Sequence, residues 1–319
     1  MASENLVPVT VGNFIRAESD HYFAALAQQG IGRFHHRRAP TPIEAQDVVR
    51  MNRDTIYSSA VFDLDAGPVA IALPDPGKRF MSMQVISEDH YTIEVVYSPG
   101  RYTYTKERVG TRYVATIVRV LADPRSAHDL KVANALQDAI RVEQERVGEF
   151  AVPNWDPATG QVVRDALKVL GTRLEPGFDG FGRREEVDPV AHLIGTAIGW
   201  GGNPRADAVY ESRHPQRNDG KTAYVLTVKD VPVDGFWSIS VYNAQGYFEK
   251  NELDIYSINN LTAAVNQDGS YTVRFGGCAP GVANCLPIMP GWNYTVRMYR
   301  PREAILSGTW KFPGEDPAL

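Results

Sequence analysis

One short segment of the sequence, residues 50–58, gathers several groups that could do chemistry: two guanidinium groups, a carboxamide, a carboxylate and a phenol. Asp54 could act as a general base, and Arg53 could hold an oxyanion with its planar set of donors. The other polar side chains of the segment are candidate substrate contacts: Arg50, Asn52 and Tyr57. The alternative is structural, with Asp54 ending a turn and pairing with one of the two arginines in a buried network.

Histidines supply a second set of candidates. His90 could be a general base, because either of its neighbours Glu88 and Asp89 could orient the ring, although turn histidines often have no catalytic role. His192 lies on an apolar helical face and is expected to be a hydrogen-bonded core residue. The basic run from His35 to Arg38 is expected to be a solvated turn.

Tryptophans and tyrosines beside polar residues could bind a ligand. In the run from Trp200 to Pro204, two glycines would let the backbone approach a ligand and Asn203 offers both a donor and an acceptor. A packed helix end would have the same composition. In the last third of the chain, aromatic side chains could stack on a sugar or an aromatic ring, although about half of them must face the core at a strand's period of two. The chosen candidates are Trp237, Tyr242 and Trp292.

The elements that must position these residues follow from the apolar pattern. A helix is expected over residues 9–29, with Phe14, Ala17 and Ala24 on its apolar face. β-Branched and aromatic runs predict strands at 69–73, 80–86, 91–97, 102–105 and 113–120. Helices are expected at 131–147, at 158–170 after the pair Asp156-Pro157, and after a second such pair, Asp188-Pro189. Strands return from 223 to 310.

This order predicts a mainly β fold with helices, of the α+β type. We expect an N-terminal helix at 1–32, a first β domain at 33–125, a helical connector at 126–215 and a second β domain at 216–319. Within the second β domain, the turn residues 267–269 between 262–265 and 271–275 predict a hairpin. The two cysteines, Cys278 and Cys285, enclose a turn-rich loop and could form a disulfide, with Cα atoms within about 7 Å of each other.

Composition excludes several classes of protein. The net charge is −5 and the basic residues are scattered, so nucleic acid is not an expected partner. No apolar run is long enough for a membrane span. The first residues lack the pattern of a signal peptide, so the sequence as it stands indicates a cytoplasmic protein; removal of a signal peptide would instead make it periplasmic or secreted. A homo-oligomer is compatible with the sequence.

Common catalytic motifs are missing from the sequence. There is no Gly-x-Ser-x-Gly turn, Walker loop, dinucleotide-binding glycine motif or His-Glu-x-x-His helix. The cysteines and histidines also lack the spacing of typical zinc sites. We therefore expect neither an organic cofactor nor a metal.

Blocks of residues along nearly the whole chain resemble one bacterial family, in which two domains of unknown function, numbered 1254 and 1214, are fused. The blocks of the first half are Phe34-His-His-Arg37, Arg50-Met-Asn-Arg-Asp-Thr-Ile-Tyr57, Phe62-Asp-Leu-Asp65, Gly77-Lys-Arg-Phe-Met-Ser-Met83 and Gly110-Thr-Arg-Tyr113. Those of the second half are Trp200-Gly-Gly-Asn-Pro204, Asp234-Gly-Phe-Trp-Ser238, Val241-Tyr-Asn243, Asp268-Gly-Ser-Tyr-Thr272, Asn284-Cys-Leu-Pro287 and Gly291-Trp-Asn-Tyr294. The resemblance implies two β-sandwich, jelly-roll-like modules joined by helices, and no established chemistry.

These observations lead to two hypotheses about function. The first is a cofactor-independent hydrolase or lyase that acts on a small polar, aromatic or glycan-like substrate, at a site between the two β modules. The second is a non-catalytic carbohydrate-binding or interaction protein, in which the same aromatic residues form a stacking platform.

Overall fold

The computed structural model describes residues 6–46, 49–175 and 177–318, and it divides the chain into two compact units. Strands in several antiparallel sheets are combined with helices, so the predicted α+β class is confirmed. The first unit consists of Met1–Arg37, Tyr57–Val120 and Val132–Arg205, and the second of Arg38–Ile56, Leu121–Lys131 and Ala206–Leu319. The units thus interleave along the chain, while the domain boundaries expected at 33, 126 and 216 stay predictions.

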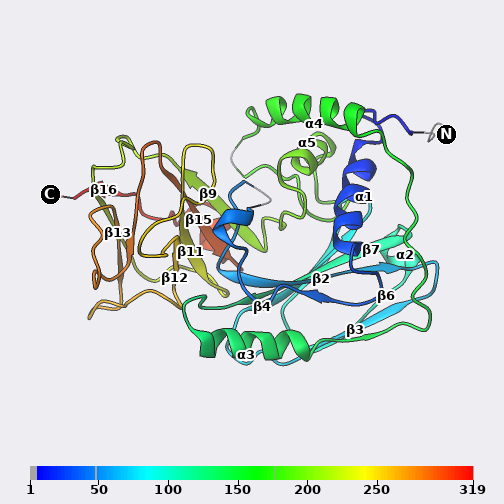
Figure 1. The fold of residues 1–319 in the computed structure, drawn as a ribbon, viewed down its shortest axis with the longest axis horizontal. Helices are drawn as coiled ribbons and strands as arrows, with labels where there is room; N and C mark the ends of the chain where they lie inside the picture. Colours follow the sequence, from blue (N-terminus) through cyan, green and yellow to red (C-terminus); the bar gives the residue numbers. More distant parts are fainter. Residues whose placement is uncertain (1–5, 47–48, 176, 319) are drawn as a thin grey trace. The chain divides into compact units, whose positions relative to one another are not determined.

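Two antiparallel sheets contribute to the first unit (Figure 1). The five-stranded sheet has the order β1 (His35–His36), β2 (Thr55–Asp63), β7 (Tyr113–Leu121), β4 (Met81–Ser87) and β5 (Thr92–Val96). The three-stranded sheet has the order β6 (Gly100–Tyr104), β3 (Val69–Leu73) and β8 (Arg141–Glu143). Every residue of β4 and β7 is buried, as expected for central strands covered on both faces. The strands predicted between residues 69 and 120 are confirmed within two residues at each end.

Three helices of the first unit pack on one another (Figure 1). They are α1 (Phe14–Ala27), α4 (Pro157–Gly171) and α5 (Pro189–Gly199), and their shared core includes Phe14, Ala17, Leu167, Ile194 and Ala197. Helix α1 also contacts the five-stranded sheet, because Phe23 packs with Val61 of β2 and Tyr113 of β7. Both contacts fix the position of α1, which carries polar residues of the site described below.

The predicted helix starts at the two Asp-Pro pairs are confirmed. The side chain of Asp156 accepts a hydrogen bond from the backbone nitrogen of Ala158, and Asp188 caps α5 in the same way. Proline occupies the first helical position in both cases, where its missing N–H is not needed. These caps set the beginnings of α4 and α5.

The helix predicted at 131–147 is shorter and lies earlier than expected. Helix α3 (Ala127–Asp138) ends before Ile140, and β8 follows, with Val142 opposite Ile71 of β3. Pairing with β3 satisfies the backbone of the three strand residues, and this tertiary contact overrides the local helical pattern. The remaining short elements are α2 (Lys106–Val109), α6 (Glu303–Leu306) and the 3₁₀ turn η1 (Ile43–Ala45).

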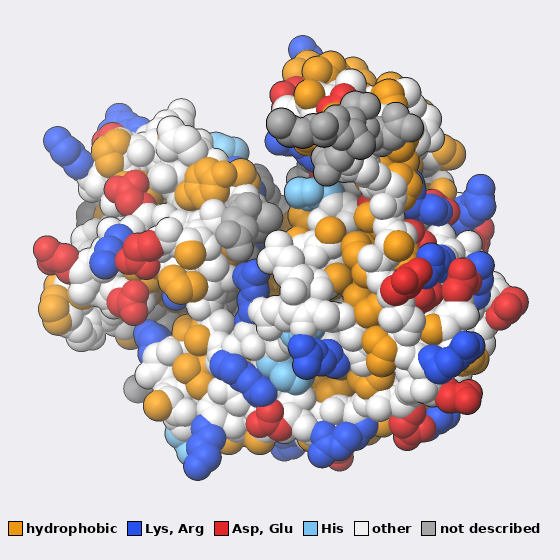
Figure 2. All heavy atoms as spheres, turned by 45° about the vertical axis from the view of Figure 1, so that its right-hand side comes forward, with side chains coloured by type: hydrophobic (Ala, Val, Ile, Leu, Met, Phe, Trp, Pro, Cys, Tyr) orange, Lys and Arg blue, Asp and Glu red, His pale blue; other side chains and the backbone are white. Residues whose placement is uncertain are grey.

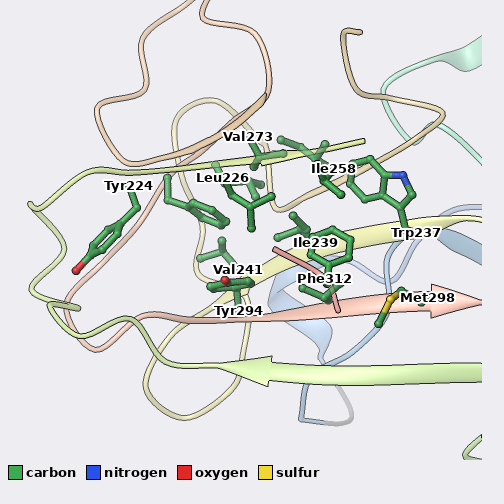
Figure 3. Packing of buried hydrophobic residues seen from close by; sticks show 14 of the residues in the cluster. Tyr224, Leu226, Trp237, Ile239, Val241, Ile258, Val273, Tyr294, Met298 and Phe312 are labelled. Atoms are coloured by element: carbon green, nitrogen blue, oxygen red, sulfur yellow. The ribbon is translucent and has the colours of Figure 1, made fainter. Parts of the chain in front are cut away.

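The second unit is a β-sandwich of two four-stranded sheets. One sheet has the order β14 (Cys285–Leu286), β13 (Tyr271–Phe275), β10 (Tyr224–Val228) and β16 (Asp316–Pro317), and the other β12 (Ser257–Asn259), β11 (Trp237–Tyr242), β15 (Asn293–Tyr299) and β9 (Ala208–Arg213). Leu226 and Val273 of the first sheet share one buried cluster with Ile239 and Tyr294 of the second (Figure 3). Inward-facing apolar residues of both sheets therefore form the core between them.

The hairpin predicted around residues 267–269 is only partly correct. The turn is present, since the backbone nitrogen of Asn266 donates to the oxygen of Ser270 and Gly269 has a φ of 82°. Residues 262–265 are not a strand, however, and β13 pairs with β10 and β14 instead. The local turn signal was right, and the partner strand came from a distant part of the chain.

A disulfide joins Cys278 to Cys285, whose Cα atoms lie 5.5 Å apart. The prediction that this loop brings the two residues within bridging distance is therefore confirmed.

Replacing both cysteines by alanine is expected to lower the free energy of unfolding by about 2 kcal/mol, because the open loop has more conformational freedom in the unfolded chain. Chemical denaturation of the two proteins measures this difference. Adding a reductant to the wild type should produce a similar loss, and equal stability of all three samples would contradict the prediction.

Acidic and basic side chains are interspersed over the face shown in Figure 2, as their scatter along the sequence suggests. Among the helices within the described ranges, none is long and apolar enough to cross a bilayer.

Candidate functional site

Arg297 fastens the polar segment at residues 50–54 to the sandwich of the second unit. Its buried guanidinium group donates to the backbone oxygen of Arg50 at 2.7 Å, to that of Met51 at 3.4 Å, to Tyr242 Oη at 2.6 Å and to Ser240 Oγ at 2.9 Å. Tyr242 donates in turn to the backbone oxygen of Met51 at 2.7 Å. The segment is therefore held by a buried hydrogen-bond network.

Arg50 and Asn52 take part in the same attachment. Nη1 of Arg50 donates to Asn293 Oδ1 at 2.7 Å and to Thr295 Oγ1 at 3.1 Å, both on β15. Nδ2 of Asn52 lies 3.1 Å from Tyr299 Oη. These contacts explain the two side chains as parts of the fold.

Asp54 is buried with 1% of its surface exposed. Its Oδ1 accepts a hydrogen bond from Asn259 Nδ2 at 3.0 Å, and Oδ2 has no hydrogen-bond partner in the described part of the chain. The expected ion pair with Arg53 or Arg50 does not occur among the residues described. Asp54 therefore orients Asn259, and its burial separates it from any substrate arriving from solvent.

Arg53 and Tyr57 belong to different units of the structure. Arg53 lines a pocket of the second unit, whereas Tyr57 belongs to the first unit, where its ring centroid lies 5.6 Å from Cζ of Arg119. Arg119 is itself buried and donates to Gln84 Oε1 at 2.9 Å. Of the predicted cluster, Arg53 thus lines a pocket.

His90 is a core histidine in this structure. Its Nδ1 lies 2.8 Å from Thr196 Oγ1, and its Nε2 accepts from the backbone nitrogen of Gly201 at 2.8 Å. Burial, reinforced by the nearby His192, lowers the pKa of His90 to about 3, so the ring is neutral at physiological pH. Both ring nitrogens are engaged in hydrogen bonds and the residue is 2% exposed. These two facts argue against His90 as a general base.

His192 and Trp200 pack with His90. Both ring nitrogens of His192 lie 2.9 Å from backbone oxygens, in agreement with the expected core role. The indole of Trp200 donates to Ser19 Oγ at 3.2 Å and stacks on Tyr22 with ring centroids 4.5 Å apart. These contacts favour the packed helix end over a ligand loop.

The neighbouring residues at the end of α5 support the same interpretation. A Cβ atom at Gly202 would lie 2.9 Å from the ring of Phe181, so close packing explains this glycine. Asn203 is buried with 6% exposure. Trp237, Tyr242 and Trp292, the predicted stacking residues of the second unit, are each at most 3% exposed and offer no open face to a ligand.

The solvated turn expected at residues 35–38 is wrong for its two histidines. They form β1, which pairs with β2 and brings His36 Nδ1 to 2.8 Å from Ser58 Oγ. The hydrogen-bonded edge of the sheet orders this pair.

A pair of carboxylates in the first unit escaped the sequence analysis. Asp20 lies on α1 and Glu88 in the turn after β4, and they are 1% and 4% exposed. Asp20 Oδ2 accepts a hydrogen bond from Trp155 Nε1 at 2.8 Å, and Glu88 Oε2 accepts one from the backbone nitrogen of Tyr113 at 2.9 Å. Within the described ranges, Asp20 Oδ1 finds no donor. A bond from Asp20 Oδ1 to the Glu88 carboxylate would require a proton on one of the two groups.

The environment of the pair favours that proton. Burial raises the pKa of Asp20 to about 7; the Trp155 hydrogen bond opposes this rise, and the charge of Glu88 adds to it. Burial also raises the pKa of Glu88, with the Tyr113 hydrogen bond acting in the opposite direction. Because two buried neighbouring carboxylates cannot both ionise cheaply, this environment favours a proton on Asp20 up to about pH 7.

Asp20 lines two cavities of the first unit. The larger, of about 650 Å³, lies between residues of α1 and α4 and has Phe14, Val152 and Trp155 among its walls. The smaller, of about 460 Å³, is also lined by Trp155 and includes Glu88. Both volumes are typical of small-molecule sites.

Four of the cations around these cavities have acidic partners, whereas Lys168, which lines the larger cavity, has no ion pair among the described residues. The ion pairs are Arg16–Asp89 at 2.6 Å, Lys106–Asp65 at 2.6 Å, Arg112–Asp63 at 2.8 Å and, with a bond of 2.9 Å, Arg164–Glu18. A ligand of these cavities therefore meets few uncompensated positive charges, which suits a neutral polar molecule.

The helical pattern contained a signal for Asp20. It lies three residues after Ala17 and four before Ala24, which places a carboxylate on the predicted apolar face. Glu88 gave no such signal, because its approach to Asp20 depends on how α1 packs near the β4–β5 turn. Within residues 6–46, 49–175 and 177–318, no group of three or more His, Cys, Asp or Glu residues is arranged to hold a metal ion.

Two segments of the sequence match models of known protein families. Residues 31–144 match the model of a protein of unknown function, DUF1254, and residues 208–303 match that of a second one, DUF1214. No curated protein sequence matches the chain.

Two solved structures resemble the fold. The VPA0106 protein from Vibrio parahaemolyticus has a TM-score of 0.75 and 19% identity, over 97% of this chain and 98% of that one. A putative uncharacterized protein from Burkholderia cenocepacia has a TM-score of 0.54 and 13% identity, over 96% and 87%. At these identities the likeness concerns the fold alone. With both models matched in one sequence, the chain belongs to the family in which DUF1254 and DUF1214 are fused.

Proposed function

We propose that the protein is a cofactor-independent hydrolase or lyase whose acid–base pair is Asp20 and Glu88. The observation that carries this proposal is the buried pair itself: both carboxylates line one cavity, Asp20 also lines a second, and burial raises the pKa of each. Such pairs suit general acid–base catalysis, because one member can donate a proton while the other accepts one.

Each member has a supported role in this scheme. Trp155 donates to Asp20 Oδ2 and fixes its orientation, so that the protonated carboxyl can deliver its proton to a leaving-group oxygen. The backbone nitrogen of Tyr113 stabilises the charge on Glu88. Ionised Glu88 would then take a proton either from an attacking water, in hydrolysis, or from a carbon acid, in elimination.

The residues that line the cavities favour a neutral, polar substrate that contains a ring. Four of the surrounding cations are paired, with Lys168 as the exception, and Trp155 lines both cavities with an aromatic ring. This aromatic face also supports the second candidate, carbohydrate binding without turnover.

A panel of esters, lactones and glycosides, assayed between pH 5 and pH 9, tests the proposal. We expect kcat/KM to change with an apparent pKa near 7 for at least one class. Asp20→Asn and Glu88→Gln should each lower kcat by about 100-fold or more. Glu143→Gln, which removes a carboxylate from an exposed ion pair with Arg101 in the same unit, is the matched control and should have little effect.

Two outcomes would count against catalysis by this pair. Turnover that survives Asp20→Asn would contradict the assignment of the acid. Saturable binding of a glycan without any turnover would favour the carbohydrate-binding alternative.

A further inference from the structure

A second pocket lies wholly within the second unit. Its volume is about 360 Å³, and Arg53 and Arg125 are the cations among its lining residues. Pro40, Leu130 and Tyr256 supply apolar and aromatic wall. The pocket therefore combines positive charge with a surface that suits an organic group.

The guanidinium group of Arg53 is fixed but only partly used. Nη1 donates to the backbone oxygen of Thr41, and Cζ lies 5.2 Å from the ring centroid of Tyr256 and 6.0 Å from that of Phe248. Among the residues that the structure describes, nothing accepts a hydrogen bond from Nε or Nη2. This edge carries the parallel pair of donors that fits a carboxylate.

Arg53 also lacks a close counter-ion. No described carboxylate lies within ion-pair distance of it. Burial lowers the pKa of Arg53, and Asp254 is the largest of the charges that oppose this effect. Glu44, another nearby acid, is paired with Lys250 at 3.0 Å. A half-buried cation in this state is stabilised by any anion that reaches its free edge.

We propose that this pocket binds a small organic carboxylate, with the free edge of Arg53 as its anchor. The carboxylate would accept two parallel hydrogen bonds, and its apolar body would lie against Pro40, Leu130 and Tyr256. Asp254 also lines the pocket, and its negative charge opposes a dianion such as phosphate more strongly than a monoanion. This site is separate from the acid–base site proposed for the first unit and takes a ligand of the opposite character, charged rather than neutral.

Calorimetric titration of the full-length protein with benzoate tests the proposal. We expect benzoate to bind at least 10-fold more tightly than benzamide, its neutral analogue, and than inorganic phosphate. Arg53→Lys keeps the charge but loses the paired donors, so it should weaken benzoate binding at least 10-fold. Arg302→Lys, at an exposed pair with Asp234 in the same unit, is the matched control and should bind as the wild type does.

A second measurement tests the proposal even if the Arg53→Lys variant does not fold. In arginine Nε–H NMR spectra of the wild type, benzoate should shift one signal strongly, and Asp20→Asn should bind benzoate unchanged because its substitution lies in the other unit. Absence of saturable benzoate binding below about 10 mM would overturn the proposal. Equal affinity in wild type and Arg53→Lys, or preference for phosphate over benzoate, would also overturn it.

Discussion

Asp20→Asn is expected to stabilise the protein by up to about 4 kcal/mol at pH 8 while it abolishes the proposed activity. The pKa of Asp20 rises from 3.8 in a solvated chain to about 7 in the fold, a difference of about 3 at 1.36 kcal/mol for each pKa unit. Asparagine resembles the protonated acid and carries no charge, so the variant avoids the cost of a buried charge.

The stability difference between Asp20→Asn and the wild type should depend on pH. Between pH 4 and pH 7 the unfolded chain releases the Asp20 proton while the folded protein keeps it, so the wild type loses stability relative to the variant as the pH rises. The difference should be absent below pH 4, grow through this window and stay constant above pH 7. Denaturant unfolding of both proteins at several pH values measures it.

The exposed neighbour provides the control. Asp89 is 42% exposed in its pair with Arg16, and Asp89→Asn should change stability by less than about 1 kcal/mol, as a loss. If Asp20→Asn destabilises the protein at pH 8, Asp20 is ionised and paired in the fold, and the proton assigned to the pair is not there.

Arg297→Met should lower the free energy of unfolding by about 3–5 kcal/mol. The substitution removes the donor to the backbone oxygen of Arg50 and to Ser240 Oγ, both in a buried network. It also removes a positive charge that interacts with Asp54: burial lowers the pKa of Arg297, and the interactions with Tyr242, Tyr299 and Asp54 raise it. A buried carboxylate would then remain without compensation.

Thermal and denaturant unfolding of Arg297→Met test this account, with Arg302→Met as a control at an exposed pair. Adding Asp54→Asn to Arg297→Met should recover part of the loss, because it removes the uncompensated charge. A loss below about 1 kcal/mol for Arg297→Met would show that the segment at residues 50–54 does not depend on this network.

Local signals in the sequence predicted the elements whose causes are local. The Asp-Pro starts of α4 and α5, the strands between residues 69 and 120, and the Cys278–Cys285 contact all depend on neighbours within a few positions. The wrong predictions concern elements that pair with distant parts of the chain. Strand β8 replaces the end of a predicted helix because it pairs with β3. Residues 262–265 are not the partner of β13, which pairs with β10 and β14.

The same distinction applies to the candidate site. The density of polar groups at residues 50–57 indicated a special region, yet it could not show that Arg50 and Asn52 bond to β15 strand residues or that Arg53 lines a pocket. Asp20 could have been noticed on the apolar face of its helix. Its partner Glu88 could not, since 68 residues of chain separate them and only the packing of α1 brings them together.

The central claim is that Asp20 and Glu88 share one proton near neutral pH. The most direct test is an NMR titration of the side-chain carboxyl carbons in the wild-type protein, with Asp20→Asn used to assign the Asp20 signal. We expect that signal to titrate with a midpoint near pH 7. A midpoint below about pH 5 would mean that Asp20 is fully ionised at neutral pH, which would contradict the acid–base pair and the function proposed from it.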